Sequence, residues 1–173
     1  MKIPWFGLMI ASVTSFIIVV LLGPSVIRLL TKLKFGQTIR AEGPKTHQTK
    51  AGTPTMGGIL ILFGITAGTI AAFGGNWTNN LRWTLFLTVG YGVLGLIDDL
   101  LNILFHRSLG LKARYKLLGQ VFLAGLFGLY VVQSGVMETL KIPYFTTHLA
   151  FVNPVLTFLF VVFTLVAMSN AVI

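Results

Sequence analysis

Long stretches without a charged residue dominate the chain. Five such runs occupy residues 3–27, 51–81, 83–97, 117–137 and 142–173. A helix needs about 20 apolar residues to cross a hydrocarbon core of about 30 Å, and four of the runs are long enough. The run that ends at Ile97 is interrupted by Asp98 and Asp99 but continues uncharged to Phe105. The pattern therefore predicts an all-α, polytopic membrane protein with about five transmembrane helices, at residues 5–27, 56–75, 83–105, 117–137 and 154–172.

Composition agrees with the membrane class. Hydrophobic residues make up 55% of the chain, charged residues make up 10%, and the mean hydropathy is +0.87. A soluble domain carries about 25% charged residues, so an aqueous surface could hardly be covered here. The absence of cysteine excludes disulfides, cysteine-based zinc sites and thiol nucleophiles. The first run is longer than the apolar core of a signal peptide. It contains Gly23-Pro24 near its end and is followed by Arg28 rather than by a small-residue cleavage pattern, so we expect a retained membrane helix.

Lysine and arginine residues are distributed unevenly between the expected loops. The segments 28–53 and 98–116 carry ten of them, whereas the opposite side carries only Lys2, Arg82 and Lys141. Because cytoplasmic loops are enriched in these residues, we expect the N-terminus outside and the C-terminal end inside. The same rule predicts cytoplasmic loops at 28–55 and 106–116 and outer loops at 76–82 and 138–153.

The net charge of +9 implies an anionic partner. Nucleic acid is excluded as that partner, because the basic residues are split between two loops at the membrane face. Attraction to anionic headgroups of the lipid bilayer accounts for most of the excess. A polyanionic substrate is the more specific alternative. Net charge alone does not distinguish a lipid partner from such a substrate.

Glycine and proline residues within the predicted spans and loops indicate where helices bend or pack closely. Gly23-Pro24 is expected to kink the first helix, because proline removes a backbone donor. Residues 138–153 are expected to form a small extended or hairpin element. Glycines inside the spans are expected to let helices approach closely rather than to carry chemistry. They are Gly64, Gly68, Gly90, Gly92 and Gly95.

Asp98 and Asp99 are the first candidates for chemistry. Carboxylates within a membrane span cost several kcal/mol unless they are paired, hydrated or bound to a cation. Adjacent residues diverge by about 100° around a helix, so the two should not chelate one ion as a matched pair. Different roles are more plausible, one aspartate ligating Mg²⁺ and the other orienting a second group. The alternative is an interfacial pair satisfied by Arg107 or water.

The loop at residues 37–58 combines cations, hydroxyls and glycines and runs directly into a predicted helix. Lys45, Lys50, Arg40 and His47 can contact phosphate oxygens. Thr55 can cap the helix, whose N-terminal N–H groups favour an anion. The alternative is an ordinary solvated positive-inside loop, which explains the charge but not the run of glycine, threonine and proline.

A third candidate group consists of Lys112, Arg114, Lys116 and Gln120. Lys116 and Gln120 are four residues apart and therefore share one face at the start of the fourth span. Lys116 is a candidate contact for phosphate or a lipid headgroup. The alternative is a lysine that snorkels to the membrane surface.

Several motifs resemble the MraY family of phospho-N-acetylmuramoyl-pentapeptide transferases, within the polyprenyl-phosphate N-acetylhexosamine-1-phosphate transferase superfamily. The resemblance is collinear over essentially the whole chain. The Pro-Thr-Met-Gly-Gly form of the first motif favours this family over its relatives. The motifs are Lys50-Ala51-Gly52-Thr53-Pro54-Thr55-Met56-Gly57-Gly58, the preceding Gly43-Pro44-Lys45-Thr46-His47, Gly95-Leu96-Ile97-Asp98-Asp99, Gly110-Leu111-Lys112, Lys116-Leu117-Leu118-Gly119-Gln120 and Ser169-Asn170-Ala171-Val172.

The resemblance implies the N-terminal half of a ten-helix enzyme of the bacterial inner membrane, with its active site on the cytoplasmic face. The implied reaction transfers phospho-MurNAc-pentapeptide from UDP-MurNAc-pentapeptide to undecaprenyl phosphate, giving lipid I and UMP, with Mg²⁺ as cofactor and a homodimer as a candidate assembly. Asp98 and Asp99 would be catalytic, and either is a candidate metal ligand. The expected substrate and phosphate contacts are Lys45, His47, Lys50, Thr55 and Lys116.

Two departures from the family pattern qualify this expectation. Asn102 occupies a position that is usually lysine in the family. The chain ends at Ile173, before the family's Asn-Leu-Thr-Asp-Gly motif, its main metal-ligating aspartate and its histidine-rich loop, so we expect the 173-residue chain alone to be inactive.

Three other interpretations remain open. The first is a non-catalytic membrane fragment of that enzyme, and the second is another polyprenyl-phosphate sugar-1-phosphate transferase. A transporter would also use intramembrane aspartates. A transporter predicts charges near the bilayer midplane and paired broken helices in two halves, and the sequence shows neither.

Overall fold

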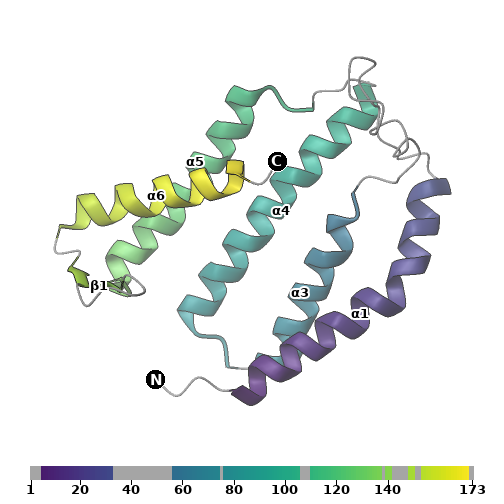
Figure 1. The fold of residues 1–173 in the computed structure, drawn as a ribbon, viewed down its shortest axis with the longest axis horizontal. Coiled ribbons are helices and arrows are strands. Elements are labelled where there is room, and N and C mark those ends of the chain that lie inside the picture. The colour runs from purple at the N-terminus through teal and green to yellow at the C-terminus, as the bar shows by residue number, and fades with distance from the viewer. Residues whose placement is uncertain are drawn as a thin grey trace. The chain divides into compact units, whose positions relative to one another are not determined.

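Within the residues that it describes, the computed structural model is helical apart from one pair of short strands and the connecting turns (Figure 1). It describes residues 5–32, 56–74, 76–105, 110–137, 139–141, 148–150 and 153–171. The all-α membrane class predicted from the charge-free runs is confirmed. The described helices are α1 (Trp5–Lys32), α3 (Gly58–Phe73), α4 (Asn79–Phe105), α5 (Ala113–Ser134) and α6 (Pro154–Ala171).

The two strands lie between α5 and α6 in the chain. β1 (Thr139–Lys141) pairs antiparallel with β2 (His148–Ala150), and Thr139 lies opposite Ala150. The hairpin expected within residues 138–153 is therefore confirmed. After it, the Asn153 carboxamide oxygen accepts hydrogen bonds from the backbone N–H groups of Val155 at 2.9 Å and Leu156 at 3.4 Å. With proline at the first helical position, this cap starts α6.

Four of the described helices, α1, α4, α5 and α6, are long and apolar enough to cross a membrane. Large apolar side chains cover their outer faces, as shown by Phe163, which is 73% exposed. Such a surface suits lipid rather than water. The apolar α3 has only 16 residues, which corresponds to about 24 Å of helix. It ends at Gly74, where the backbone turns to a φ of 38° and the N–H donates to the Ile70 carbonyl at 2.8 Å.

Several helices extend beyond the charge-free runs that predicted them. α1 continues through Arg28 to Lys32, and Arg28 Nε donates to the Pro24 carbonyl at 3.2 Å. α4 begins before Arg82, and α5 begins before Lys116. Lysine and arginine are good helix formers, and their long side chains can extend to a membrane surface from inside a helix. The charge-free run therefore marks the apolar part of each helix rather than its ends.

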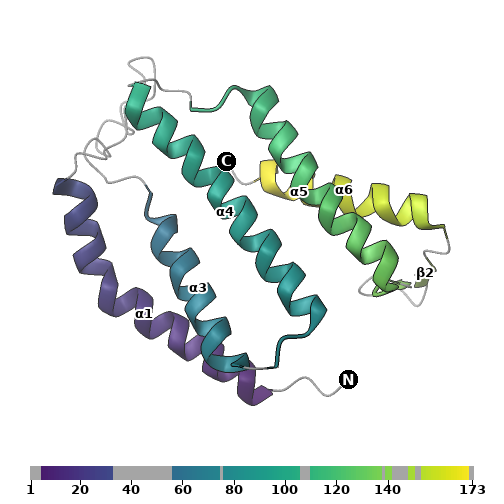
Figure 2. The same ribbon diagram turned by 180° about the vertical axis from the view of Figure 1, so that it is seen from behind.

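The chain divides into two compact units, Met1–Lys112 and Ala113–Ile173. In the first unit, α3 lies between α1 and α4 (Figures 1 and 2). Ser15 Oγ of α1 donates to the Gly64 carbonyl of α3 at 2.9 Å. A methyl group added at Gly68 would collide with the Ser15 hydroxyl and the Ala11 carbonyl. The packing role predicted for Gly64 and Gly68 is confirmed, because the backbones of α1 and α3 touch there.

We expect Gly68→Ala to destabilise the first unit by about 1–3 kcal/mol, because the new methyl group has no space against α1. Tryptophan fluorescence during thermal unfolding in detergent would measure the loss. Gly57→Ala is the matched control, since a methyl group there meets nothing within 4 Å and the φ of −57° suits alanine. Equal melting temperatures for the two variants would contradict the close contact.

In the second unit, α5 packs against α6. Ala124 is fully buried in α5, and Val131 is 7% exposed. A methyl group added at Gly128 would lie 3.1 Å from the Phe158 ring of α6. The small side chains of α5 therefore form the surface on which the larger side chains of α6 rest.

Candidate active site

Asp98 and Asp99 lie in the C-terminal part of α4. At about 1.5 Å per residue, Asp98 is roughly 28 Å from the start of the helix at Asn79 and roughly 10 Å from its end at Phe105. Both side chains are half-buried. The carboxylates therefore sit toward one end of a membrane-length helix, where cation or water can reach them at lower cost than at its middle.

Asp98 binds the chain segment that follows α4. Its Oδ1 accepts a hydrogen bond from the Leu111 N–H at 2.7 Å. Gly110 lies so close that a methyl group there would collide with the Asp98 carbonyl and carboxylate. Glycine is thus required at position 110 by close approach, and one oxygen of Asp98 is engaged by the backbone. Arg107, the alternative partner named from the sequence, lies outside the described residues.

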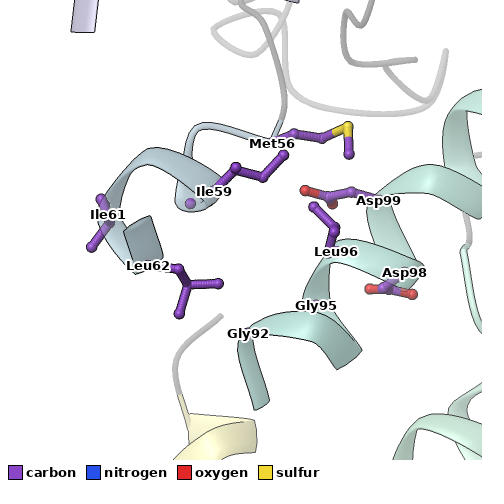
Figure 3. A pocket seen from close by; sticks show the side chains of 10 residues that line it. Met56, Ile59, Ile61, Leu62, Gly92, Gly95, Leu96, Asp98 and Asp99 are labelled. Atoms are coloured by element: carbon purple, nitrogen blue, oxygen red, sulfur yellow. The ribbon is translucent and has the colours of Figure 1, made fainter. Parts of the chain in front are cut away.

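A cavity of about 420 Å³ opens between α3 and α4, and Asp99 belongs to its wall. Figure 3 shows the Asp99 carboxylate extending from α4 toward the end of α3 that carries Met56 and Ile59. Apolar walls raise the strength of a nearby charge's field, because they exclude water. The described residues that line the cavity are Met56, Gly58, Ile59, Ile61, Leu62, Gly92, Gly95, Leu96, Asp98 and Asp99.

The glycines of α4 have two different roles in this wall. A methyl group at Gly92 would collide with the Leu62 side chain, so Gly92 brings α3 and α4 together. A methyl group at Gly95 would meet nothing within 4 Å. Gly95 therefore leaves space in the cavity next to the aspartates instead of packing against a helix, which differs from the packing role predicted for it.

Met56 holds an unusual backbone conformation at the start of α3. Its φ is 72°, a left-handed value that costs a non-glycine residue about 1–2 kcal/mol. Its side chain is only 7% exposed and lines the cavity, and its carbonyl accepts the Ile59 N–H at 3.1 Å. Strain of this kind persists where surrounding contacts hold it, and such residues cluster at functional sites. No sequence pattern pointed to Met56 individually.

Asn102 follows Asp98 by one helical turn of α4. Its Oδ1 is buried and has no hydrogen-bond partner within the part of the chain that the structure describes. A buried acceptor without a donor costs about 1–3 kcal/mol. The amide oxygen therefore marks a place beside the aspartates where a donor or a cation would be stabilised.

None of the residues predicted to contact phosphate lies in the described part of the first unit. Four of them are outside the described residues, namely Lys45, His47, Lys50 and Thr55. Lys116 belongs to α5 in the second unit, where it is half-buried one turn before Gln120. Gln120 is 2% exposed and accepts a hydrogen bond from Asn170 Nδ2 of α6 at 2.8 Å. This contact between two sequence motifs was not predicted.

The oxygen atoms near the cavity suit Mg²⁺ as part of a site. No group of three histidine, cysteine or acidic side chains that could hold a metal occurs among the described residues. Mg²⁺ is commonly bound by one or two carboxylates, with waters and substrate phosphates completing its octahedron. Asp99, whose carboxylate lines the cavity, is the described side chain that fits this kind of ligand.

These features define a multi-pass membrane protein with a carboxylate-bearing cavity toward one end of its helices. The family model of glycosyl transferase family 4 matches residues 81–172, which is more than half of the chain. The signature 1 of phospho-N-acetylmuramoyl-pentapeptide-transferase matches residues 50–62. The chain therefore belongs to glycosyl transferase family 4, a family of transferases.

Three relatives called phospho-N-acetylmuramoyl-pentapeptide-transferase show how far the similarity extends. The protein of Geobacillus thermodenitrificans is 47% identical over 79% of this chain and 43% of its own length. The protein of Oceanobacillus iheyensis is 41% identical over 96% of this chain and 51% of its own. The protein of Bacillus subtilis is 42% identical over 91% of this chain and 49% of its own. The chain thus spans about half the length of the curated relatives it matches.

Proposed function

We propose that this chain provides the aspartate-bearing half of a phospho-MurNAc-pentapeptide transferase. The enzyme would transfer phospho-MurNAc-pentapeptide from UDP-MurNAc-pentapeptide to undecaprenyl phosphate and release UMP. The observation that carries the proposal is the shared cavity between α3 and α4. The signature segment 50–62 contributes Met56 and Ile59 to it, and the family match at 81–172 contributes Asp99. Two segments matched separately to known transferases therefore line one site.

The reaction places strong demands on charge. An oxygen of the lipid phosphate attacks the β-phosphorus of the UDP-sugar, and the bond from that phosphorus to the bridging oxygen of UMP breaks. The second pKa of a phosphate monoester is near 6, so the attacking group is already largely dianionic at neutral pH. Positioning and charge neutralisation therefore matter more than removal of a proton.

Different residues of this chain would position the phosphates and neutralise their charge. Mg²⁺, when bound, supplies the positive charge that offsets the pyrophosphate and the leaving UMP. Asp99 would hold this ion from the cavity wall. Asp98 would keep Gly110 and Leu111 in place through its hydrogen bond to the Leu111 N–H. The basic residues Lys45, Lys50, His47 and Lys116, with Thr55, are proposed to contact phosphate oxygens, as arginine and lysine do in charge-assisted hydrogen bonds.

UMP release tests the proposal directly. A full-length version of the protein, reconstituted with undecaprenyl phosphate and Mg²⁺, should release UMP from UDP-MurNAc-pentapeptide and form lipid I. UDP-N-acetylglucosamine is the control substrate, and it should give little product. Turnover of the control alone would assign the chain to another sugar-1-phosphate transferase, and no UMP from either nucleotide would reject the proposal.

We further propose that the site faces the cytoplasm of a bacterial inner membrane, because ten of the 13 lysine and arginine residues lie in the segments 28–53 and 98–116. Lys45→Cys and Lys112→Cys should be shielded from an impermeant thiol reagent in intact cells, whereas Asn79→Cys should be labelled. The natural sequence lacks cysteine, so labelling reports the introduced site alone. Labelling at position 45 from outside would reverse the orientation.

A further inference from the structure

Of the residues that the structure describes, Met56 is the only one other than glycine with a left-handed backbone. Its φ is 72°, and its side chain is 7% exposed and belongs to the cavity wall. Two glycines follow it directly, yet Gly57 has a φ of −57°, which any residue adopts. A methyl group added at Gly57 or at Gly58 would meet nothing within 4 Å. The conformation that favours glycine therefore falls on methionine, beside two glycines that do not need it.

Stability alone does not explain a methionine at this position. The left-handed backbone is unfavourable for methionine, whereas burial of its side chain is favourable, and the two effects are of similar size. Glycine would avoid the strain and forgo the burial, so it should serve the fold about as well. Strained residues of this kind cluster where the strain places a group for function. The side chain at position 56 is therefore the feature that the strained turn retains.

The Met56 side chain belongs to the end of the cavity toward which Asp99 extends. Figure 3 shows it directed from the start of α3 toward α4, and the Asp99 carboxylate extends from α4 toward this end of α3. Ile59 and Leu96 add apolar wall to the same cavity. Apolar groups beside a carboxylate exclude water, and the interaction of the carboxylate with a cation becomes stronger as water is excluded. Met56 is thus suited to keep one side of Asp99 dry.

We propose that Met56 is a positioning residue whose strained backbone holds the thioether in the cavity, where it keeps water away from Asp99 and from the reacting phosphorus. The inference rests on the proposed transferase function. Exclusion of water strengthens charge interactions in a site and prevents hydrolysis as a side reaction. Without the thioether, a water oxygen could bond to the β-phosphorus in place of the lipid phosphate. The bond to the bridging oxygen of UMP would break, one proton would pass to solvent, and the sugar would leave as its 1-phosphate.

Thiol labelling tests the shielding without any turnover. In the 173-residue chain, which has no natural cysteine, Asp99→Cys should react slowly with a charged methanethiosulfonate reagent. Adding Met56→Gly should raise that rate about tenfold, whereas Met56→Leu fills the same space and should leave it low. Leu104→Cys is the matched control, because Leu104 is also near the end of α4, is 67% exposed and does not line the cavity. Its rate should not respond to Met56→Gly. Equal rates for Asp99→Cys with and without Met56→Gly would overturn the inference.

The ratio of the two products tests the role in the reaction. In a full-length version supplied with both substrates, the unmodified protein should form UMP and lipid I in equal amounts. Met56→Gly should form lipid I about tenfold more slowly and release UMP in at least about twofold excess over it. Met56→Leu should return both quantities toward those of the unmodified protein. Slower formation of lipid I with no excess of UMP would overturn the inference.

The melting temperature distinguishes shielding from a role confined to folding. Met56→Gly should shift it by less than about 5 °C, because relief of strain offsets the lost burial. Met56→Ala keeps the strain, loses the burial and should melt at a lower temperature. Both variants remove the thioether, so both should label rapidly at Asp99→Cys. Rapid labelling with Met56→Ala alone would trace the exposure to unfolding and overturn the inference. Absence of UMP from the unmodified full-length protein would instead reject the proposed function, and the labelling rates would still decide the shielding.

Discussion

Asp99→Asn, in a full-length version of the protein, should lower kcat by at least ~100-fold, which is about 2.7 kcal/mol of transition-state stabilisation. The carboxylate faces the cavity that both family segments line, and its replacement removes one charge without changing its size. Loss of a preorganised charge partner at a reacting phosphate has effects of this magnitude. Protein yield should hold, because removal of a charge from a membrane helix does not penalise folding.

Asp98→Asn should also lower kcat by at least ~100-fold, but for a different reason. Asparagine keeps an Oδ1 that can accept the Leu111 N–H, so the backbone contact survives and only the charge is lost. Asp98→Ala removes both and should reduce thermal stability as well. Initial rates over a Mg²⁺ titration would separate the aspartates, since the variant of the metal-holding residue should need more Mg²⁺. Near-normal kcat in both asparagine variants would end the assignment of this site.

Gly95→Leu should lower kcat/KM by about 100-fold, comparable to the loss expected from misplacing a bound substrate. Space is open beside Gly95, and a leucine side chain would occupy much of the cavity of about 420 Å³ next to Asp99. Leucine is a better helix former than glycine by up to about 1 kcal/mol, so α4 should be stabilised. The melting temperature should therefore rise while kcat/KM falls.

Two further variants check that explanation of the Gly95→Leu effect. Gly95→Ala adds only a methyl group and should retain at least about half of the turnover. Val93→Leu enlarges a side chain that is 44% exposed and does not line the cavity, so it should have no effect. Full activity of Gly95→Leu would mean that substrate does not use the space between α3 and α4.

The fold was largely predictable from the sequence, because burial in lipid selects for uncharged runs of helical length. The predicted span at 56–75 was longer than α3, since Gly74 is apolar enough to extend the run but adopts a positive φ that ends the helix. The predicted helix starts near Arg82 and Lys116 were late, because charge marks the membrane boundary rather than the end of helical hydrogen bonding. Helix ends are set by local backbone conformation, which hydropathy does not encode.

The candidate site was only partly predictable. Asp98 and Asp99 stood out because a charge within an apolar run is costly. Their different environments follow from residues distant in sequence, namely Leu111, which donates to Asp98, and Met56, which lines the same cavity as Asp99. Gln120 and Asn170 were noticed as motif members, but their pairing spans 50 positions and has no sequence signal. Lys45, His47, Lys50 and Thr55 remain predictions.

The short α3 has a consequence for the lipid around it. Its 16 residues span about 24 Å, whereas a bilayer core is about 30 Å thick. Hydrophobic mismatch of this size is relieved by thinning of the bilayer next to the helix. Headgroups and water would then descend toward the Met56 end of α3. Under the proposed function, a phosphate attached to a long lipid could then reach Asp99 while the lipid tail stays at its normal depth.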